Sequence, residues 1–422
     1  MDKSLEPVAG GGLLDRRLFL KRGLMFSTAT AVSPQVLAKF KSFDSSLPSW
    51  MLKPGEPFSN YGQPSEHENK TIRWTMGNSM APGNGVSWTP LHDLEGTITP
   101  NGLHFERHHN GVPQIDPAKH QLVIHGLVNN PLMFSIENLL RYPMRSMFCF
   151  VECGGNSNAG WRSKPIQTQV GYFHGMASCS EWTGIPLYVL LEEAGIKASA
   201  KWLIAEGADA AAMNISIPLD KALDDCIVAL YQNGERIRPE NGYPLRLVVP
   251  GWEGVVNVKW LRRLHLTTQP SMTRNETSKY TELLPSGKAR QFTFIMDAKS
   301  VITNPSLGYK MAKPGLYQVT GLAWSGRGKI AKVEVSADGG NIWAEAELQK
   351  PVMAKCFTRF RIPWQWQGNQ VVIKSRATDE TGYQQPEREE LIKQRGQNGY
   401  FHYNAVVSWK ISADGAISHV YA

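Results

Sequence analysis

The middle of the chain alternates between two hydrophobic patterns. From Pro117 to about Pro270, short runs rich in apolar and β-branched residues predict strands, and runs with an apolar residue every three or four positions predict helices between them. Asn233-Gly234 predicts a two-residue hairpin. The alternation is typical of a mixed α+β domain. The predicted strands are Gln121–Val128, Met147–Glu152, Trp202–Glu206, Ile227–Gln232, Leu245–Val249 and Val255–Thr267.

Cap residues indicate where the helices of this domain begin and end. Ser135 is a candidate N-cap for a short helix through Tyr142, because a serine hydroxyl can accept from the free amides of a first turn. Thr183 is a candidate cap for a second helix, with Pro186 near its start and Gly195 closing it.

The pattern changes after a linker at residues 273–291. Short alternating strands follow, separated by Gly-rich or Asp-Gly turns, and no helical period is visible. Strands at this spacing predict an immunoglobulin-like sandwich, without its cross-sheet disulfide because Cys356 is the one cysteine of the region. The predicted strands are Tyr317–Ser325, Lys329–Ala337, Trp343–Leu348, Cys356–Pro363, Gln370–Thr378 and Tyr403–Ser412.

These patterns divide the chain into four segments. Residues 39–116 are rich in Pro, Gly, Asn and Ser with little periodicity, which predicts an extended arm that is ordered by what it packs against. The α+β domain is expected at 117–285 and the all-β domain at 286–422. Residues 1–38 form a separate segment at the start.

Composition and charge exclude several classes of protein. The 422 residues are 42% apolar and 19% charged, as in a folded globular chain, and the apolar stretch near the N-terminus is too short for a membrane-spanning helix. The formal net charge is +8, but the basic residues after position 38 are scattered among acids, which argues against nucleic-acid binding. A mild positive field still favours anionic substrates or acidic partners.

The first 38 residues resemble an export signal. The run Asp15-Arg16-Arg17-Leu18-Phe19-Leu20-Lys21 is followed by a weakly apolar stretch and then by the small-residue site Val36-Leu37-Ala38. This order is typical of a twin-arginine signal, which a receptor reads and a peptidase removes, whereas an ordinary amphipathic helix is the alternative. We therefore expect a periplasmic protein that is exported after folding, a route common for enzymes whose cofactor is inserted in the cytoplasm.

Of the five cysteines, Cys153 is the candidate for a functional site. They stand at 149, 153, 179, 226 and 356 without CxxC, CxxCH or zinc spacing, so we expect no disulfide framework, structural zinc or bound haem. Cys153 ends a strand-like run and precedes Gly154-Gly155, where the backbone can turn tightly. A thiolate at such a strand end suits a soft metal or a nucleophile, and a small core residue is the alternative.

Distinctive sequence blocks follow one another from about residue 100 to the C-terminus. They are Phe105-x-Arg107-His108-His109-x-x-Val112-Pro113, Cys153-Gly-Gly-Asn156, Glu206-Gly-x-Asp209, Pro244-x-Arg246-x-Val-Val-Pro250-Gly251, Val258-Lys259-Trp260-Leu261, Trp324-Ser325-Gly326 and Val335-Ser-x-Asp338-Gly339-Gly340-x-x-Trp343. In this order they resemble the sulfite oxidase family of molybdenum enzymes. The resemblance implies an α+β molybdopterin-binding domain of the sulfite oxidase type, followed by an all-β immunoglobulin-like sandwich.

The resemblance also assigns roles to residues. Cys153 matches the thiolate that ligates molybdenum, one metal per chain, beside the dithiolene of a molybdopterin. Arg107 and Tyr280 match the other catalytic positions, and a tyrosine hydroxyl can donate toward an oxygen ligand of the metal. Cys149 matches no ligand and is expected in the core. The positions expected to bind the cofactor are Arg107, His108, His109, Cys153, Asp209, Asn241, Arg246, Asn257, Val258 and Lys259.

Some positions depart from the sulfite-oxidising members of the family. Those members have an arginine where this chain has Asn158, a histidine at Asn241, a basic residue or histidine at Asn257, and a further arginine that cannot be placed within Asn398–Tyr403. Sulfite is a dianion that needs clustered cationic groups, so these changes favour a neutral sulfane sulfur instead. The twin-arginine motif and the Glu152–Asn156 block favour the same sulfane-oxidising branch.

The resemblance thus implies a molybdenum enzyme that oxidises sulfane sulfur, carried on the cysteine of a carrier protein, toward sulfate. Because the chain has no haem motif, electrons would leave through a separate c-type cytochrome subunit, and a homodimer would form through the last domain. Three alternatives stay open: a sulfite dehydrogenase, a periplasmic reductase of oxidised methionine, and a non-catalytic interaction protein with Cys153 in its core.

Overall fold

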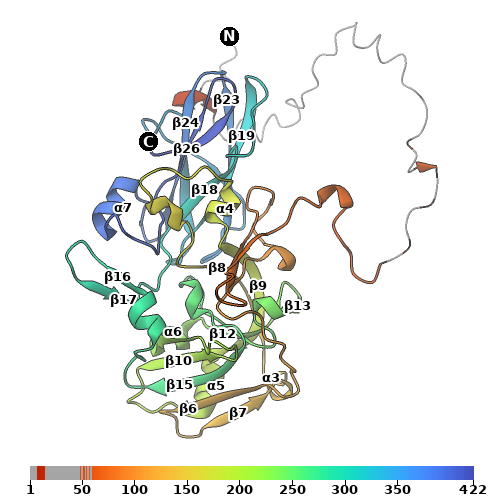
Figure 1. Cartoon of the computed structure of the whole chain (residues 1–422), viewed down its shortest axis with the longest axis vertical. Helices are drawn as coiled ribbons and strands as arrows, with labels where there is room; N and C mark the ends of the chain where they lie inside the picture. Colours follow the sequence, from red (N-terminus) through yellow and green to blue (C-terminus); the bar gives the residue numbers. More distant parts are fainter. Residues whose placement is uncertain (1–6, 15–47, 49–50, 53, 55–56, 58) are drawn as a thin grey trace.

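The computed structural model describes residues 7–14, 48, 51, 52, 54, 57 and 59–422. Two bodies lie end to end along the long axis, an α+β domain at one end and a β-sandwich at the other (Figure 1). The arginine pair and the cleavage site expected in the export signal lie outside the described residues. In the part of the chain that is described, no helix is long and apolar enough to cross a bilayer.

Two sheets build the α+β domain, and the short helices α3, α5 and α6 share its apolar core, whereas α4 packs against β18 of the sandwich. The first sheet has the order β11-β10-β15-β6-β7 and is antiparallel except where β15 runs parallel to β6. The second has the order β13-β12-β9-β8, with β14 paired to β12. Helix α5 contacts β6 of the first sheet and β9 of the second, so its buried leucines join the two sheets in one core.

The bounds of these elements are β6 (Gln121–Gly126), β7 (Leu132–Ser135), α3 (Ile136–Leu139), β8 (Arg145–Glu152), α4 (Val170–His174), β9 (Ala177–Pro186), α5 (Leu187–Ala194), β10 (Trp202–Gly207), β11 (Asn214–Pro218), α6 (Leu219–Asp224), β12 (Ile227–Gln232), β13 (Glu235–Arg236), β14 (Arg246–Val248) and β15 (Leu261–Thr267). Short 3-10 turns lie at η5 (Glu66–Glu68), η6 (Asn101–Leu103), η7 (Asn158–Trp161), η8 (Pro239–Asn241) and η9 (Gly254–Val256).

Several predicted elements of this domain are confirmed. The hairpin at Asn233-Gly234 joins β12 to β13, with Gln232 paired to Glu235. Ser135 caps α3, and its hydroxyl accepts from the Asn138 amide, although the helix ends at Leu139 rather than Tyr142.

Two predictions for this domain are wrong. Thr183 is not a helix cap, because it lies inside β9, whose ladders to β8 and β12 engage its backbone; α5 begins only at Leu187. The run Val255–Thr267 is a strand only from Leu261. Its first part turns through η9, where the buried Asn257 accepts the Val249 amide through its side chain and takes the backbone out of the ladder.

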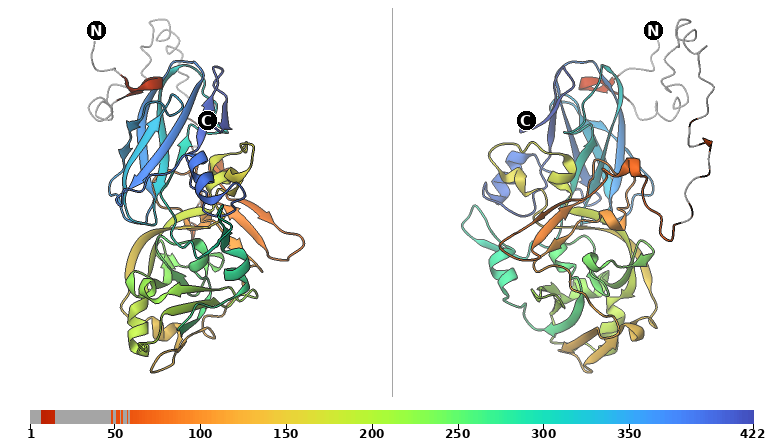
Figure 2. Two further views of the ribbon diagram at one scale, coloured as in Figure 1. Left: turned by 90° about the vertical axis from the view of Figure 1, so that its left-hand side faces the viewer. Right: turned by 45° about the vertical axis from the view of Figure 1, so that its right-hand side comes forward.

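The arm before the α+β domain contains strands that the sequence pattern does not predict. In it β3 (Trp74–Gly77), β4 (Gly85–Trp88) and β5 (Arg107–His108) form a small antiparallel sheet beside the junction of the two domains (Figure 2). The alternation is hard to recognise because β3 is exposed along its whole length. The sheet carries Arg107 and His108 to the end of β8.

Two sheets also build the C-terminal sandwich. Their orders are β1-β2-β23-β19-β18, with β22 also on β23, and β21-β20-β24-β25-β26. The bounds are β1 (Pro7–Ala9), η2 (Gly10–Gly12), β2 (Leu13–Leu14), β18 (Lys299–Asn304), β19 (Gly315–Trp324), β20 (Ile330–Ser336), β21 (Ala344–Glu345), β22 (Glu347–Leu348), β23 (Thr358–Trp366), β24 (Val371–Asp379), α7 (Arg388–Arg395), β25 (Ser408–Ile411) and β26 (Ile417–Val420).

The expectation that no helix occurs in this domain is wrong. Helix α7 lies between β24 and β25, and Leu391 is its one buried residue, so it presents almost no apolar period to detect. The predicted strand Tyr403–Ser412 shortens to β25 because the residues before Ser408 run without ladder pairing. The linker also has structure: a π-helical turn η10 (Asn275–Lys279) and the hairpin β16 (Thr281–Leu283) and β17 (Ala289–Gln291).

Candidate active site

Cys153 stands at the junction of the two domains, immediately after β8. Its amide donates to the Met176 carbonyl at 2.9 Å, and its carbonyl accepts the Asn156 amide at 2.8 Å, so the chain turns directly after the thiol. The Asn156 side chain donates to the Glu152 carboxylate and to the His174 carbonyl and accepts the Met176 amide. Gly154 fits this turn because a Cβ there would stand 1.7 Å from the Glu253 carboxylate. The thiol is thus held on a loop that is fixed by backbone hydrogen bonds and by the Asn156 side chain.

The C-terminal domain contributes directly to this loop through Glu152. That carboxylate is completely buried and pairs with Lys299 of β18 at 2.6 Å. Its second oxygen accepts the indole N–H of Trp324, from β19, also at 2.6 Å. Because a buried charge needs both a partner and hydrogen bonds, the second domain is part of what positions Cys153.

Two connected cavities open beside Cys153. The inner one has about 780 Å³ of space free of protein atoms and the outer one about 2700 Å³, both including space open to solvent. Arg107, His109, Cys153 and Tyr280 line both cavities. Cys153 is therefore not a core residue, whereas Cys149 is buried as expected.

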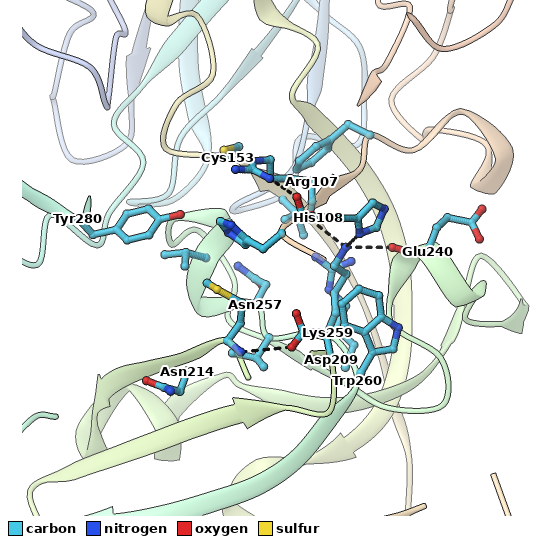
Figure 3. A pocket seen from close by; sticks show the side chains of 18 residues that line it. Arg107, His108, Cys153, Asp209, Asn214, Glu240, Asn257, Lys259, Trp260 and Tyr280 are labelled. Atoms are coloured by element: carbon cyan, nitrogen blue, oxygen red, sulfur yellow. Dashed lines mark hydrogen bonds between the residues drawn. The ribbon is translucent and has the colours of Figure 1, made fainter. Parts of the chain in front are cut away.

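The structure brings together nearly all of the residues expected to bind a cofactor. Arg107, His108, His109, Cys153, Asp209, Arg246, Asn257, Val258, Lys259 and Tyr280 all line the inner cavity, and most of them are labelled in Figure 3. Asn241 does not line it. Its side chain donates to Gln232, and its carbonyl accepts from Arg246, so it lies behind the lining and supports that guanidinium.

Three cations of the inner cavity, Arg107, Lys259 and Arg246, have no carboxylate partner within 4.0 Å among the described residues. Lys259 donates to the carbonyls of Arg107 and Glu240 and to the ring of His108 at 2.7 Å, all neutral acceptors in this arrangement (Figure 3). Arg246 is 5% exposed; it donates to Asn241, and its Nε has no hydrogen-bond partner. Burial lowers the pKa of Lys259 well below its usual range and that of Arg246 to about 10.

Three groups that line the cavity near the thiol, Cys153 itself, Tyr280 and His109, have pKa values shifted toward their neutral forms. Burial raises the pKa of Cys153 to about 11, so the free thiol keeps its proton until a metal displaces it. Burial also raises the pKa of Tyr280 well above its usual range, and its hydroxyl points into the cavity as a donor (Figure 3). Burial and the Arg107 charge lower the pKa of His109 to about 4, which keeps that ring neutral. Arg107 is therefore the permanent cation beside the thiol.

An aromatic wall that the sequence pattern does not reveal lines the outer cavity. Tyr280 stacks on Phe401 at 5.1 Å, and Phe401 packs edge-on against Tyr400 at 4.8 Å. The loop 396–401 carries these side chains in from the C-terminal domain. Its aromatic run is visible in the sequence, but no spacing rule places it beside residues more than 240 positions earlier. Met213 and Asn214, at the start of β11, are further lining residues that sequence reasoning missed.

Comparison with known proteins gives these domains a family. Residues 109–275 match the family description "Oxidoreductase molybdopterin binding domain" and residues 290–409 match "Mo-co oxidoreductase dimerisation domain". The solved structure of the sulfane dehydrogenase SoxCD from Paracoccus pantotrophus is similar with a TM-score of 0.86 and 43% identity, over 89% of this chain and 97% of that one. The chain belongs to the sulfite oxidase family of molybdopterin enzymes.

Curated members of the sulfite oxidase family match with lower identity. Mitochondrial sulfite oxidase of Rattus norvegicus is 30% identical over 71% of this chain and 56% of that enzyme. NADH nitrate reductase of Solanum lycopersicum is 30% identical over 71% of this chain and 37% of that enzyme. The chain thus spans about a third to just over half of the length of these relatives. The fold class expected from the sequence, a molybdopterin-binding domain followed by an all-β dimerisation domain, is confirmed.

The residues of the inner cavity fit a molybdenum cofactor. No group of three or more His, Cys, Asp or Glu side chains within the described residues is placed to hold a bare metal ion, so a metal here needs ligands from a cofactor in addition to Cys153. A dithiolene-bound molybdenum meets that need and prefers a soft thiolate. Arg246, with its unpartnered Nε, and Lys259, with neutral acceptors alone, match an anionic phosphate.

Proposed function

We propose that this chain is the molybdenum subunit of a periplasmic sulfane dehydrogenase. Its substrate is zero-valent sulfur bound to a cysteine of a carrier protein, which it oxidises toward sulfate, and its electrons pass to a c-type cytochrome subunit. The observation that carries the proposal is the 43% identity to the SoxCD structure over 89% of this chain. The solved relative is named for this activity, and the dimerisation domain that this chain also contains supports a homodimer.

Each cavity residue has a task in this reaction that its surroundings support. When bound, the molybdenum cofactor supplies two-electron oxygen-atom transfer, with water as the source of oxygen. Cys153 would ligate the metal through its sulfur, while Arg246 and Lys259 would hold the cofactor's phosphate. Tyr280 keeps its proton and donates a hydrogen bond toward the reacting oxygen, and Arg107 adds a fixed positive charge. Sulfane sulfur needs about three such two-electron rounds to reach sulfate.

The uncharged residue at position 158 of the outer cavity supports a neutral substrate. Asn158 lines this cavity without a charge, and Arg395 is neutralised there by Glu282 at 2.8 Å. Arg162 lines it as an exposed side chain. Arg274 and Lys279 line it as well, so the cavity as a whole carries positive charge, and the missing cation at position 158 is the feature that favours a neutral sulfur over a dianion. The width of the cavity and its wall of Tyr280, Phe401 and Tyr400 suit an apolar arm that carries sulfur on its end.

Turnover of two substrates tests the proposal. The purified chain, combined with its cytochrome subunit, should reduce the haem far faster with carrier-bound sulfane sulfur than with free sulfite at equal concentration. Equal efficiency with free sulfite would replace the proposal with a sulfite dehydrogenase. Reduction of methionine sulfoxide by a quinol-coupled assay, with no oxidation of either sulfur substrate, would favour the reductase.

The periplasmic location rests on the leader and has its own test. Export should remove residues 1–38, and Arg16→Lys with Arg17→Lys should leave the precursor in the cytoplasm, because the receptor reads the arginine pair itself. Mass spectrometry of the intact protein from each compartment decides this. Normal export and processing of the double variant would contradict the leader assignment.

A further inference from the structure

The first described residues of the chain lie against the C-terminal sandwich. β1 and β2 pair with each other around the turn Gly10–Gly12, and Leu13 of β2 pairs with Trp364 of β23. The Trp364 indole donates to the Gly11 carbonyl at 2.5 Å. These strands, in red beside β23 in Figure 1, thus extend a sheet whose other members begin nearly 300 residues later.

The contact is part of the core of the sandwich. Leu13 is fully buried and Ala9 is 7% exposed, and both belong to the apolar cluster that contains Trp364 and Ala337. Burial of one leucine side chain contributes about 1.5–3 kcal/mol. A segment that merely rested on the surface would not reach this depth.

The turn between the two strands fits because it is made of glycine. A Cβ on Gly11 would stand 2.2 Å from the Ala337 carbonyl oxygen, and one on Gly12 would stand 2.0 Å from that of Gln365. Both glycines also have positive φ, at 73° and 90°. The backbone of the turn approaches the backbone of the sandwich so closely that no side chain fits.

The edge of β23 that faces away from β19 is covered by two short strands. β22 covers one half of it and β2 the other. β22 pairs with the half at Phe360 and Arg361. The half at Trp364 pairs with β2 alone on that side. An uncovered strand edge exposes unpaired amides and carbonyls, which makes it a template for another strand.

We propose that the Trp364 half of the β23 edge, with the Ala337 carbonyl beside it, is a docking site for the start of the export leader. In the precursor, the folded C-terminal sandwich binds residues 7–14, which end two positions before Arg16-Arg17. Removal of the leader leaves this docking site empty and uncovers the Trp364 half of β23 in the mature chain. Docking needs both β23 and the Ala337 turn in place, so the leader is anchored only on a folded sandwich. The inference rests on the leader assignment under the proposed function.

Hydrogen exchange of the full-length precursor tests the docking. Amides of residues 9–14 and of Trp364–Gln365 should exchange at least tenfold more slowly in the wild type than in Gly11→Val. The valine side chain would collide with the Ala337 backbone and prevent docking. Gly62→Val is the matched control, because nothing lies within 4 Å of a Cβ there. Equal, unprotected exchange of residues 9–14 in the wild type and in Gly11→Val would overturn the proposal.

A second measurement covers the case in which Gly11→Val does not fold. A synthetic peptide of residues 5–14 is added to the mature chain, and exchange at Trp364–Gln365 is followed. Slower exchange with the peptide, but not with its Gly11→Val version, supports the docking site, and no slowing with either peptide overturns it. Neither experiment depends on export, so a failed leader assignment remains distinguishable by the mass of the exported protein.

Discussion

Buried cations have different partners in the C-terminal sandwich and in the inner cavity. In the C-terminal sandwich, Lys299 pairs with Glu152 at 2.6 Å, and Arg359 lies 3.8 Å from the Glu95 carboxylate besides donating to two carbonyls and the Thr303 hydroxyl. In the inner cavity, Lys259 and Arg246 have neutral partners alone among the described residues, and the Nε of Arg246 has none there. A paired buried charge belongs to the fold, whereas an unpaired one is a cost that a bound anion can offset. The cavity is therefore organised around a ligand.

Removal of a paired cation should have the largest effect on stability. Lys299→Met leaves the fully buried Glu152 carboxylate without its cation, which should lower the free energy of unfolding by about 3–5 kcal/mol. Adding Glu152→Gln should restore much of the loss, because the remaining amide is neutral. Urea unfolding of both variants measures this. A loss below 1 kcal/mol in Lys299→Met would contradict the claim that the paired cation stabilises the fold.

Removal of an unpaired cation should behave differently. Lys259→Met in the cofactor-free chain should change the free energy of unfolding by no more than about 1 kcal/mol, or raise it, because it relieves a buried charge without orphaning a carboxylate. Urea unfolding of cofactor-free wild type and variant measures the difference. A loss as large as that of Lys299→Met would mean that Lys259 also belongs to the fold.

A cation added at the outer cavity should change the preference between the two substrates. Asn158→Arg places a guanidinium at the outer cavity, and each charge-assisted hydrogen bond to a dianion contributes about 1.5–3 kcal/mol. The KM for free sulfite should then fall about tenfold or more. Steady-state cytochrome reduction with both substrates measures the shift, and an unchanged KM for sulfite would place this position away from the substrate.

Protonation supplies a smaller effect that both halves share. Burial lowers the pKa of His104 in the α+β domain to about 3 and that of His419 in the sandwich to about 4, from 6.5. Below about pH 6.5 each ring is therefore protonated in the unfolded chain but not in the folded one. The free energy of unfolding then decreases by about 1.4 kcal/mol for each ring and each unit by which the pH is lowered. Full stability is present above that pH.

His419→Gln should remove one such contribution. The free energy of unfolding should decrease less from pH 7 to pH 5 in this variant than in the wild type. Between pH 6 and 5 the difference should correspond to the binding of about one proton, or about 1.4 kcal/mol. The exposed His67→Gln is the matched control. Parallel pH profiles for His419→Gln and the wild type would show that this ring titrates alike in both states.

Local patterns in the sequence account for most of the scaffold. Strands β6, β8, β10 and β12 and the hairpin at Asn233-Gly234 follow from apolar runs and turn residues, because each of these elements carries its own signal. Thr183 fails as a cap because tertiary pairing on both sides of β9 overrides a local preference. Helix α7 escapes detection because it buries Leu391 alone, which leaves no period to read.

The candidate site was predictable only through ordered blocks. Cys153, Arg246 and Lys259 belong to separate elements, and no periodicity indicates that they share a cavity. Asn241 was placed in the lining, but its side chain bonds Gln232 one layer behind. The aromatic wall at Tyr400 and the Lys299–Glu152 pair depend on contact between domains, and neither partner has a local signal that points to the other.

Cofactor content of the purified chain tests the central claim most directly. Molybdenum measured by plasma mass spectrometry and pterin measured by fluorescence should both approach about one per chain in the wild type and fall by about 10–100-fold in Lys259→Met. The control Lys119→Met, whose side chain is 86% exposed, should keep both. Active wild type without molybdenum, or Lys259→Met with full cofactor content, would contradict the assignment of the unpaired cations to a bound anion.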